Sequence, residues 1–380
     1  MGIAALLLVA VLLAGMSLSC MMTSNAEPYG TQPPRADRSN HPAVQAAGSV
    51  LLKDWAPDSS LVVPATDIPK ARFAVIDVHA HSSYAATADT IEEWVRTMDE
   101  VGIETTVILT GAVGAKFDQW AELYLKPHPG RFQLFAGVLR ENIDSADYPQ
   151  RAAAEVQRCY QKGARGLGEL SDKGLGYARD PSVPRDRRLH PDDPRLDLFW
   201  QKAAELKMPA NIHMADHPSA WRPPDKHQER PPKFQVYNQC GKDVPSYEEL
   251  LEVRDRLLAR HPENIFIACH LGNQGNDLAS LSKVMDRFAN LYLDISARRY
   301  ELGRQPRQAA KFLTKYRDRV LFGTDQGRRE EMYRGYWRLL ESPDEYMSDQ
   351  CWWPVYGLEL SEPVLKAIYR ENAKRILNWR

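Results

Sequence analysis

The sequence lacks the cysteine pattern of a zinc–thiolate site or of a disulfide-rich domain. Its five cysteines lie far apart and form no CxxC pair: Cys20, Cys159, Cys240, Cys269 and Cys351. This spacing excludes a zinc ribbon and predicts free, mostly buried thiols. One disulfide stays open as an alternative in an oxidising compartment.

The chain also lacks an excess of charge of either sign. Its formal net charge is -1, with 49 basic and 50 acidic residues, and no segment carries a basic stripe. A general nucleic-acid-binding protein usually shows such a stripe, so we expect no nucleic-acid partner. The proportions of 43% hydrophobic and 26% charged residues are typical of a globular protein.

Residues 1–26 contain no charged side chain at all. The apolar core from Ile3 to Ala14 has the length of an export-signal h-region, although the basic n-region is missing. The small residues SNA at 24–26 suit cleavage by signal peptidase. SLSC, which ends at Cys20, resembles a lipoprotein cleavage site. The uncharged stretch also approaches the length needed to span a membrane. We therefore expect export to the periplasm or cell envelope. Cleaved signal, lipid anchor and uncleaved anchor stay open, and membrane attachment, if present, is expected only through the N-terminus.

Residues 27–70 are rich in proline and show little hydrophobic periodicity, which predicts a linker. The folded domain is expected over residues 71–380. Within it, strand-length apolar runs alternate with helical segments. The runs are FAVIDV (73–78), TTVILT (105–110), FQLFAGV (132–138), ARGLGEL (164–170), MPANIHM (208–214), NIFIACHLG (264–272), NLYLDIS (290–296) and RVLFGTD (319–325). Runs without strict alternation are typical of strands buried on both faces of a parallel sheet.

Two of the intervening segments carry helix-start signals. In 89–102, Asp89 is expected to cap the helix with Glu92 three residues later, and in 245–262 Ser246 is expected to do so with Glu249. Eight strand–helix units of this total length predict an α/β fold, the (β/α)8 TIM barrel. A doubly wound sheet would favour a glycine-rich loop after the first strand, where HAHSS stands instead.

Metal-binding residue types stand at the carboxyl ends of the predicted strands, where TIM barrels carry their active sites. They are His79, His81, Glu169, His213, His270 and Asp325. His79 and His81 are one residue apart, so both side chains point to the same side of their strand. Imidazole and carboxylate together suit a divalent ion, zinc first, with manganese or iron as alternatives. Such an ion activates water, and Asp325 can then move the proton to the leaving group.

At this point the chain resembles a known family. VIDVHAH, NIHM, ACHLG and LFGTD are similar to motifs of the amidohydrolase superfamily, in particular its amidohydrolase-related branch, which includes metal hydrolases and decarboxylases. The resemblance covers about residues 72–380. It implies that His79, His81 and His213 bind metal and that Asp325 binds metal and shuttles protons. It also implies that His270 binds a second ion or polarises the substrate.

Glu169 bears on the number of ions and on the reaction. Superfamily members with two ions bridge them with a carboxylate from the fourth strand, and Glu169 occupies the matching place. This favours a two-ion hydrolase that cleaves an amide, lactone or ester bond in a small substrate. If Glu169 instead pairs with Arg165 or Lys173, a one-ion, non-oxidative decarboxylase is the alternative. An exported binding protein without catalysis is the second alternative, and the oligomeric state is left open.

Two segments are expected to shape the substrate pocket. The long segment 214–246 follows the fifth strand and could act as a lid, with Trp221 and Tyr237 as flat contacts and His217 near the pocket. In 296–306, Arg298 or Arg299 could bind a substrate carboxylate or phosphate. The competing interpretation is that these arginines pair with Asp294 or Glu301. Trp352 in the tail could line the mouth.

Overall fold

The computed structural model describes residues 42–51, 54, 59–230, 232–347 and 353–377. The chain divides into two compact units, residues 1–61 and residues 62–380. The described part of the first unit contains α1 (Pro42–Gly48). The expected signal segment, Cys20, Cys351 and Trp352 lie outside the described residues, so the interpretations placed on them remain predictions.

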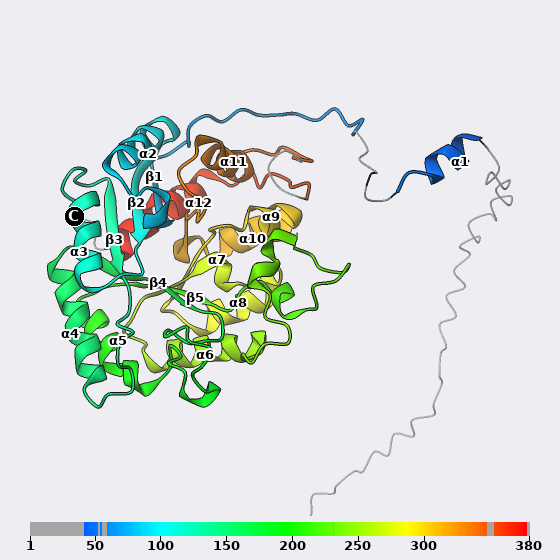
Figure 1. Cartoon of the computed structure of the whole chain (residues 1–380). Coiled ribbons are helices and arrows are strands. Elements are labelled where there is room, and N and C mark those ends of the chain that lie inside the picture. Colours follow the sequence, from blue (N-terminus) through cyan, green and yellow to red (C-terminus); the bar gives the residue numbers. More distant parts are fainter. Residues whose placement is uncertain (1–41, 52–53, 55–58, 231, 348–352, 378–380) are drawn as a thin grey trace, which may run out of the picture. The chain divides into compact units, whose positions relative to one another are not determined.

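The second unit is a ring of eight parallel strands in sequential order (Figure 1). The strands are β1 (Val75–His81), β2 (Ile103–Leu109), β3 (Phe132–Ala136), β4 (Ala164–Asp172), β5 (Ala210–Met214), β6 (Phe266–Ala268), β7 (Leu291–Asp294) and β8 (Val320–Leu321). Two backbone hydrogen bonds join the chain that follows β8 to β1. The N–H of Val78 donates to the carbonyl of Phe322 at 2.9 Å, and the N–H of Asp325 donates to that of His79 at 2.8 Å. The predicted TIM barrel is confirmed.

Helices connect successive strands and lie around the ring (Figure 1). They are α2 (Ala88–Val101), α3 (Gly114–Tyr124), α4 (Tyr148–Gln161), α5 (Asp197–Glu205), α6 (Tyr247–Arg260), α8 (Leu278–Arg287) and α10 (Pro306–Lys315), with α11 (Glu330–Glu341), α12 (Glu362–Lys366) and α13 (Asn372–Ile376) after the last strand. Ser246 caps α6 in a capping box with Glu249, as expected. The expected cap at Asp89 is wrong. Thr87 caps α2, because its hydroxyl accepts from the N–H of Thr90 and leaves Asp89 in the first turn.

A small cluster of buried apolar side chains occupies the inside of the barrel. It includes Val107 on β2 and Ile267 on β6, which lie on opposite sides of the ring, together with Ile376 at the end of α13. Side chains that reach across the ring exclude water from its interior. The polar residues at the carboxyl ends of the strands are therefore attached to a rigid, dry support.

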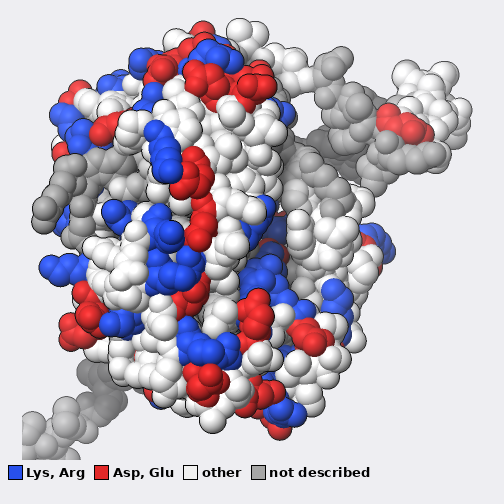
Figure 2. All heavy atoms as spheres, turned by 60° about the vertical axis from the view of Figure 1, so that its left-hand side comes forward, with Lys and Arg blue, Asp and Glu red and all other residues white. Residues whose placement is uncertain are grey.

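The state of the cysteines, the surface charge and the character of the helices each bear on a sequence-based expectation. Cys159 and Cys269 are free and buried, whereas Cys240 is free and exposed. On the face shown in Figure 2, basic and acidic side chains are interspersed and form no continuous basic stripe. Within the described ranges, no helix combines the length and the apolar character needed to cross a bilayer.

Candidate metal centre

The six candidate ligands come from five strand ends of one barrel mouth. His79 and His81 end β1, Glu169 lies in β4 and His213 lies in β5. His270 follows β6 by two residues and has a left-handed backbone (φ 58°). This conformation, which is rare for a residue with a side chain, is shared by the next residue, Leu271, and turns the chain sharply at the end of the strand.

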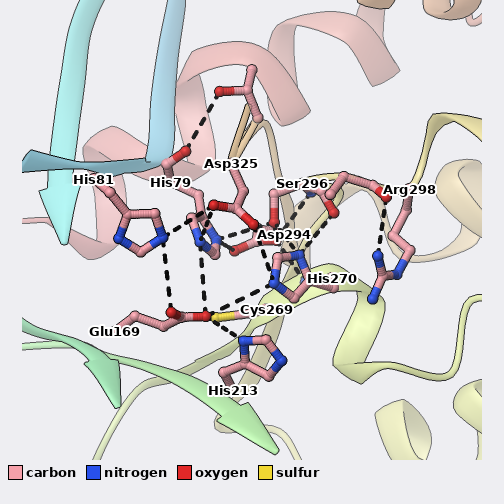
Figure 3. Close-up of polar contacts among 12 residues, drawn as sticks. His79, His81, Glu169, His213, Cys269, His270, Asp294, Ser296, Arg298 and Asp325 are labelled. Carbon is pink, nitrogen blue, oxygen red and sulfur yellow. Dashed lines mark hydrogen bonds and ion pairs between the residues drawn. The ribbon is translucent and has the colours of Figure 1, made fainter. Parts of the chain in front are cut away.

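Three of these ligands, the histidines of β1 and the one that follows β6, converge on the carboxylate of Asp325 (Figure 3). Its Oδ1 lies 3.0 Å from Nε2 of His81 and 3.7 Å from Nε2 of His79. Its Oδ2 lies 3.7 Å from Nε2 of His270. Tyr84, in the short helix that follows β1, donates its hydroxyl to Oδ1 at 2.8 Å. Asp325 therefore faces the histidines while one neutral donor fixes its orientation.

The carboxylate of Glu169 lies in the middle of the histidines (Figure 3). It is hydrogen-bonded to Nδ1 of His213. Its oxygens lie 3.8 Å from Nε2 of His81, 3.8 Å from Nε2 of His270 and 4.0 Å from Nε2 of His79. A single carboxylate thus contacts side chains from three other strands.

The alternative partners expected for Glu169 are engaged elsewhere. Lys173 pairs with Asp216, with Nζ 2.9 Å from Oδ2. Arg165 donates to backbone carbonyls, among them its neighbour Ala164 at 2.8 Å. The competing interpretation of Glu169 as a simple salt-bridge residue does not fit these contacts.

A buried network behind the site orients two of the imidazoles. Oδ2 of Asp294 lies 2.9 Å from Nδ1 of His79, and Oδ1 accepts the backbone N–H of His270 at 2.8 Å. The carbonyl of Ser296 lies 3.0 Å from Nδ1 of His270. With both Nδ1 atoms engaged, Nε2 of each ring is turned toward the carboxylates of Glu169 and Asp325, which is how proteins commonly orient ligating histidines.

The electrostatics of the cluster favour a cation. Burial opposes a charge on His79, yet Asp294 and Asp325 raise its pKa to about 10. Burial would raise the pKa of Asp325, but His79 and the neighbouring imidazoles hold it well below its usual range. The pKa of Glu169 is likewise held well below its ordinary value, against burial, chiefly by His213. Three carboxylates at this spot stabilise positive charge, which a divalent ion supplies more compactly than protons.

The donor atoms also fit an ion geometrically. One set consists of His79, His81 and Asp325 and another of His79, Glu169 and His270, and within each set the donor atoms lie within 4.8 Å of one another. Nε2 of His79 and Nε2 of His213 are buried without a hydrogen-bond partner among the described residues. A buried nitrogen that lacks a partner is costly, and a bound ion removes that cost. Imidazole and carboxylate donors suit zinc, manganese or iron.

The cluster opens into a pocket of about 850 Å³. His81, Glu169, His213, His270 and Asp325 form one part of its lining. The remainder consists of Ser83, Tyr84, Lys173, Asp216, Arg230, Phe234, Tyr237, Ala297, Arg298, Arg299, Tyr300 and Gln326. The pocket is therefore bounded both by strand ends and by the segments after β5 and β7.

Of the three expected substrate-binding residues, one lines the pocket and two do not. Arg298 lines the pocket but is bound by Asn273 and by Glu301, whose Oε1 lies 3.4 Å from Nε. Trp221 does not line the pocket, since its indole N–H donates to the carbonyl of Pro245 at 3.0 Å. His217 is buried outside the lining and accepts the N–H of Ser219 through Nδ1 at 3.2 Å. The expectation that Trp221 and His217 contact substrate is not supported by this geometry, whereas Tyr237 does line the pocket.

Sequence reasoning missed three residues of the site. Asp294 was considered only as a partner of arginine, although it stands at the end of β7, where the strand-end rule would have found it. Tyr84 lies in the short helix that follows β1 and Arg230 lies in a loop, and no periodicity pointed to either residue. Their roles depend on the folding of the segments that follow β1 and β5.

With this geometry in place, the chain can be compared with known proteins. A family model described as Amidohydrolase matches residues 69–379. The chain belongs to the amidohydrolase family. This family is metal-dependent, in agreement with the donor set formed by His79, His81 and Asp325.

Solved structures share the barrel at low sequence identity. A candidate amidohydrolase from Staphylococcus aureus is 18% identical, with a TM-score of 0.52, over 80% of this chain and 100% of its own. An uncharacterised TIM-barrel protein from Bordetella bronchiseptica is 17% identical, with a TM-score of 0.51, over 80% and 99%. A 2,6-dihydroxybenzoate decarboxylase from Rhizobium is 17% identical, with a TM-score of 0.49, over 80% and 99%. The first two likenesses show the fold, and none of the three decides the reaction. No curated protein matches the chain.

Proposed function

We propose that this amidohydrolase is a metal-dependent hydrolase that cleaves an amide, lactone or ester bond of a small substrate. The observation that supports this most strongly is the position of Glu169. Its carboxylate lies among imidazoles from β1, β5 and the end of β6, with no lysine or arginine paired to it in the described part of the chain. A carboxylate so placed can bridge two ions, which is the arrangement expected of hydrolases with two metals.

The position of each residue determines its proposed role in ion binding, proton transfer or orientation. His79, His81 and Asp325 would hold one ion, His213 and His270 would hold the other, and Glu169 would hold both. A divalent ion in this place lowers the pKa of water and supplies a nucleophile near neutral pH. Asp325 takes a proton and passes it to the leaving group, because its Oδ1 and Oδ2 face the histidines and the open pocket. Tyr84 keeps that carboxylate in one orientation.

The metal content of the purified chain tests this proposal. Protein prepared without chelator is analysed by mass spectrometry as wild type, as Glu169→Gln and as the control Glu331→Gln, an exposed residue of α11. We expect about two ions per chain in the wild type and the control, and about one in Glu169→Gln, because the amide is a poor bridging ligand.

Other results would redirect the assignment. One ion in all three proteins would contradict the bridge and favour decarboxylation, to be tested by CO2 release from carboxylated substrates. No ion in any of them, even after metal is supplied, would leave a barrel that binds a ligand without catalysis.

We also propose that the protein is exported, on the basis of the uncharged residues 1–26. Determining the N-terminus of the mature protein would distinguish cleavage after SNA from lipid attachment at Cys20 and from an intact anchor. Recovery of the full-length chain only in the cytoplasm would contradict export.

A further inference from the structure

Part of the pocket wall is cationic. Four cations line the pocket, namely Lys173, Arg230, Arg298 and Arg299. Its three carboxylates are Glu169 and Asp325, which face the histidines, and Asp216. Among the carboxylates that line the pocket, Asp216 is therefore the one available to neutralise the cations of this wall.

Asp216 is shared by two of these cations. Its Oδ2 lies 2.9 Å from Nζ of Lys173, and its Oδ1 lies 3.2 Å from Nη1 of Arg230. Arg230 also donates to the hydroxyl of Tyr300 at 3.1 Å. One carboxylate with two cations leaves one positive charge over, held in fixed geometry at the pocket wall.

Arg298 and Arg299 differ although they are neighbours. Arg298 is only 4% exposed and is held by Glu301 and Asn273, so its guanidinium is committed within the protein. Arg299 contacts neutral groups. It donates to Oε1 of Gln326 at 3.3 Å, and its guanidinium lies 5.2 Å from the ring centroid of Tyr336.

Within the described residues, Arg299 has no carboxylate at ion-pair distance, and its Nε is buried without a hydrogen-bond partner. A buried guanidinium donor without a partner is costly, and the fork geometry of arginine fits a carboxylate or phosphate with two parallel bonds. Stacking on Tyr336 restricts the guanidinium before any ligand arrives, which lowers the entropy lost on binding.

We propose that the substrate carries an anionic group, carboxylate or phosphate, remote from the bond that reacts, and that Arg299 is the residue that recognises it. Lys173 and Arg230, which line the same pocket, add a favourable electrostatic field. This inference rests on the proposed function, which places the reacting bond at the histidine end. The aromatic side chains Phe234 and Tyr237 in the lining provide flat surfaces for the body of such a molecule.

Binding of unreactive probes tests the inference without knowledge of the substrate. The full-length, zinc-loaded protein is titrated calorimetrically with benzoate, isophthalate and 3-phosphonobenzoate. Benzoate has one anionic group, which can bind at the candidate metal centre. Isophthalate and 3-phosphonobenzoate each carry a second anionic group at another position of the ring. We expect isophthalate or 3-phosphonobenzoate to bind wild type at least about tenfold more tightly than benzoate, and the tighter of the two identifies the preferred anion.

Arg299→Gln should reduce the ratio of the affinity for the two-anion probe to the affinity for benzoate to about one. The affinity for benzoate itself should stay unchanged, because the substitution removes only the contact with the second anionic group. Arg299→Lys should retain part of the ratio, since it keeps the charge but not the fork. The control Arg307→Gln, an exposed arginine of α10, should keep the full ratio. Circular dichroism of each variant verifies that it is folded.

Two results would overturn the inference: equal affinity of wild type for all three probes, or a ratio that survives in folded Arg299→Gln. Both are distinguishable from failure of the proposed function, because ion content is measured separately on the same samples. A chain that holds no ion but keeps an Arg299-dependent ratio would retain the anion site and lose the hydrolase assignment.

Discussion

Asp294 holds two histidines of the candidate metal centre with one carboxylate. Its Oδ2 lies 2.9 Å from Nδ1 of His79, and its Oδ1 accepts the backbone N–H of His270 at 2.8 Å. The hydroxyl of Ser296 contacts the same two imidazoles, 3.0 Å from Nδ1 of His79 and 2.8 Å from Nδ1 of His270. The strand ends β1, β6 and β7 are thereby tied together beneath the pocket.

Asp294→Asn should weaken ion binding without removing any candidate ligand. An amide is a weaker hydrogen-bond acceptor for Nδ1 of His79 than a carboxylate is. Loss of such a carboxylate partner typically costs about 10–100-fold in metal affinity. Competition with a chelator of known affinity measures the change. Asp318→Asn, at a residue whose side chain is 72% exposed, is the control and should bind the ion as wild type does. Unchanged affinity in folded Asp294→Asn would show that His79 needs no carboxylate behind it.

Tyr84→Phe should slow turnover and keep the ions. The substitution removes the hydroxyl that donates to Oδ1 of Asp325 at 2.8 Å, so the carboxylate proposed to transfer the proton loses its fixed orientation. Loss of one such hydrogen bond corresponds to about a tenfold decrease in kcat. The measurement is kcat on any ester or lactone that wild type hydrolyses, alongside ion content, with Tyr160→Phe at a surface position as control. An unaltered kcat would mean that Asp325 is oriented by other groups.

Asp216→Asn should destabilise the protein in a pH-dependent way. Burial would raise the pKa of Asp216, yet Lys173 and Arg230 hold it well below its usual range. A carboxyl whose pKa is lower in the folded state stabilises the protein above its unfolded pKa of about 4, and this contribution is lost as the pH falls. Urea unfolding should show a loss of about 3 kcal/mol at pH 7.

The difference between wild type and Asp216→Asn should then shrink as the pH falls below about 4. A difference that stays constant between pH 7 and pH 3 would contradict the assignment of charge to Asp216. Glu331→Gln, exposed on α11, should show no comparable difference at either pH.

Gly137→Ala should destabilise the barrel near the site. A Cβ at Gly137 would lie 2.2 Å from the carbonyl oxygen of Gly111, which is backbone and has no side chain to move aside. The N–H of Gly111 donates to the carbonyl of Gly168 at 3.0 Å, so displacement would reach the residue before Glu169. We expect a loss of about 1–3 kcal/mol in urea unfolding, as for overpacking. Gly48→Ala, where a Cβ meets nothing within 4 Å, should be neutral, and equal behaviour of the two variants would refute the steric explanation.

Much of the fold and the convergence of the candidate ligands were predictable, because both follow from a simple rule. Parallel strands of a barrel end at one mouth, so polar residues after apolar runs must meet there. Asp325 and His79 are far apart in sequence, yet the rule brings them together, and the structure places Nε2 of His79 3.7 Å from Oδ1 of Asp325.

The pocket wall was less predictable, because it depends on loops that are held by irregular contacts. Residue type suggested Trp221 and His217 as substrate contacts, but Trp221 donates to Pro245 and His217 caps its own short helix. The choice between Arg298 and Arg299 depended on which of them finds an internal carboxylate. That carboxylate is Glu301 and its partner is Arg298, a pairing that two adjacent arginines do not reveal in sequence.

The segment that follows β8 meets β1 through a hydrogen bond between two candidate ligands, since the N–H of Asp325 donates to the carbonyl of His79 at 2.8 Å. During synthesis, His79 leaves the ribosome long before Asp325 exists. A nascent chain that ends before β8 therefore presents histidines without the carboxylate that completes their cluster. The full set of candidate ligands is therefore complete only after the segment that follows β8 has been synthesised.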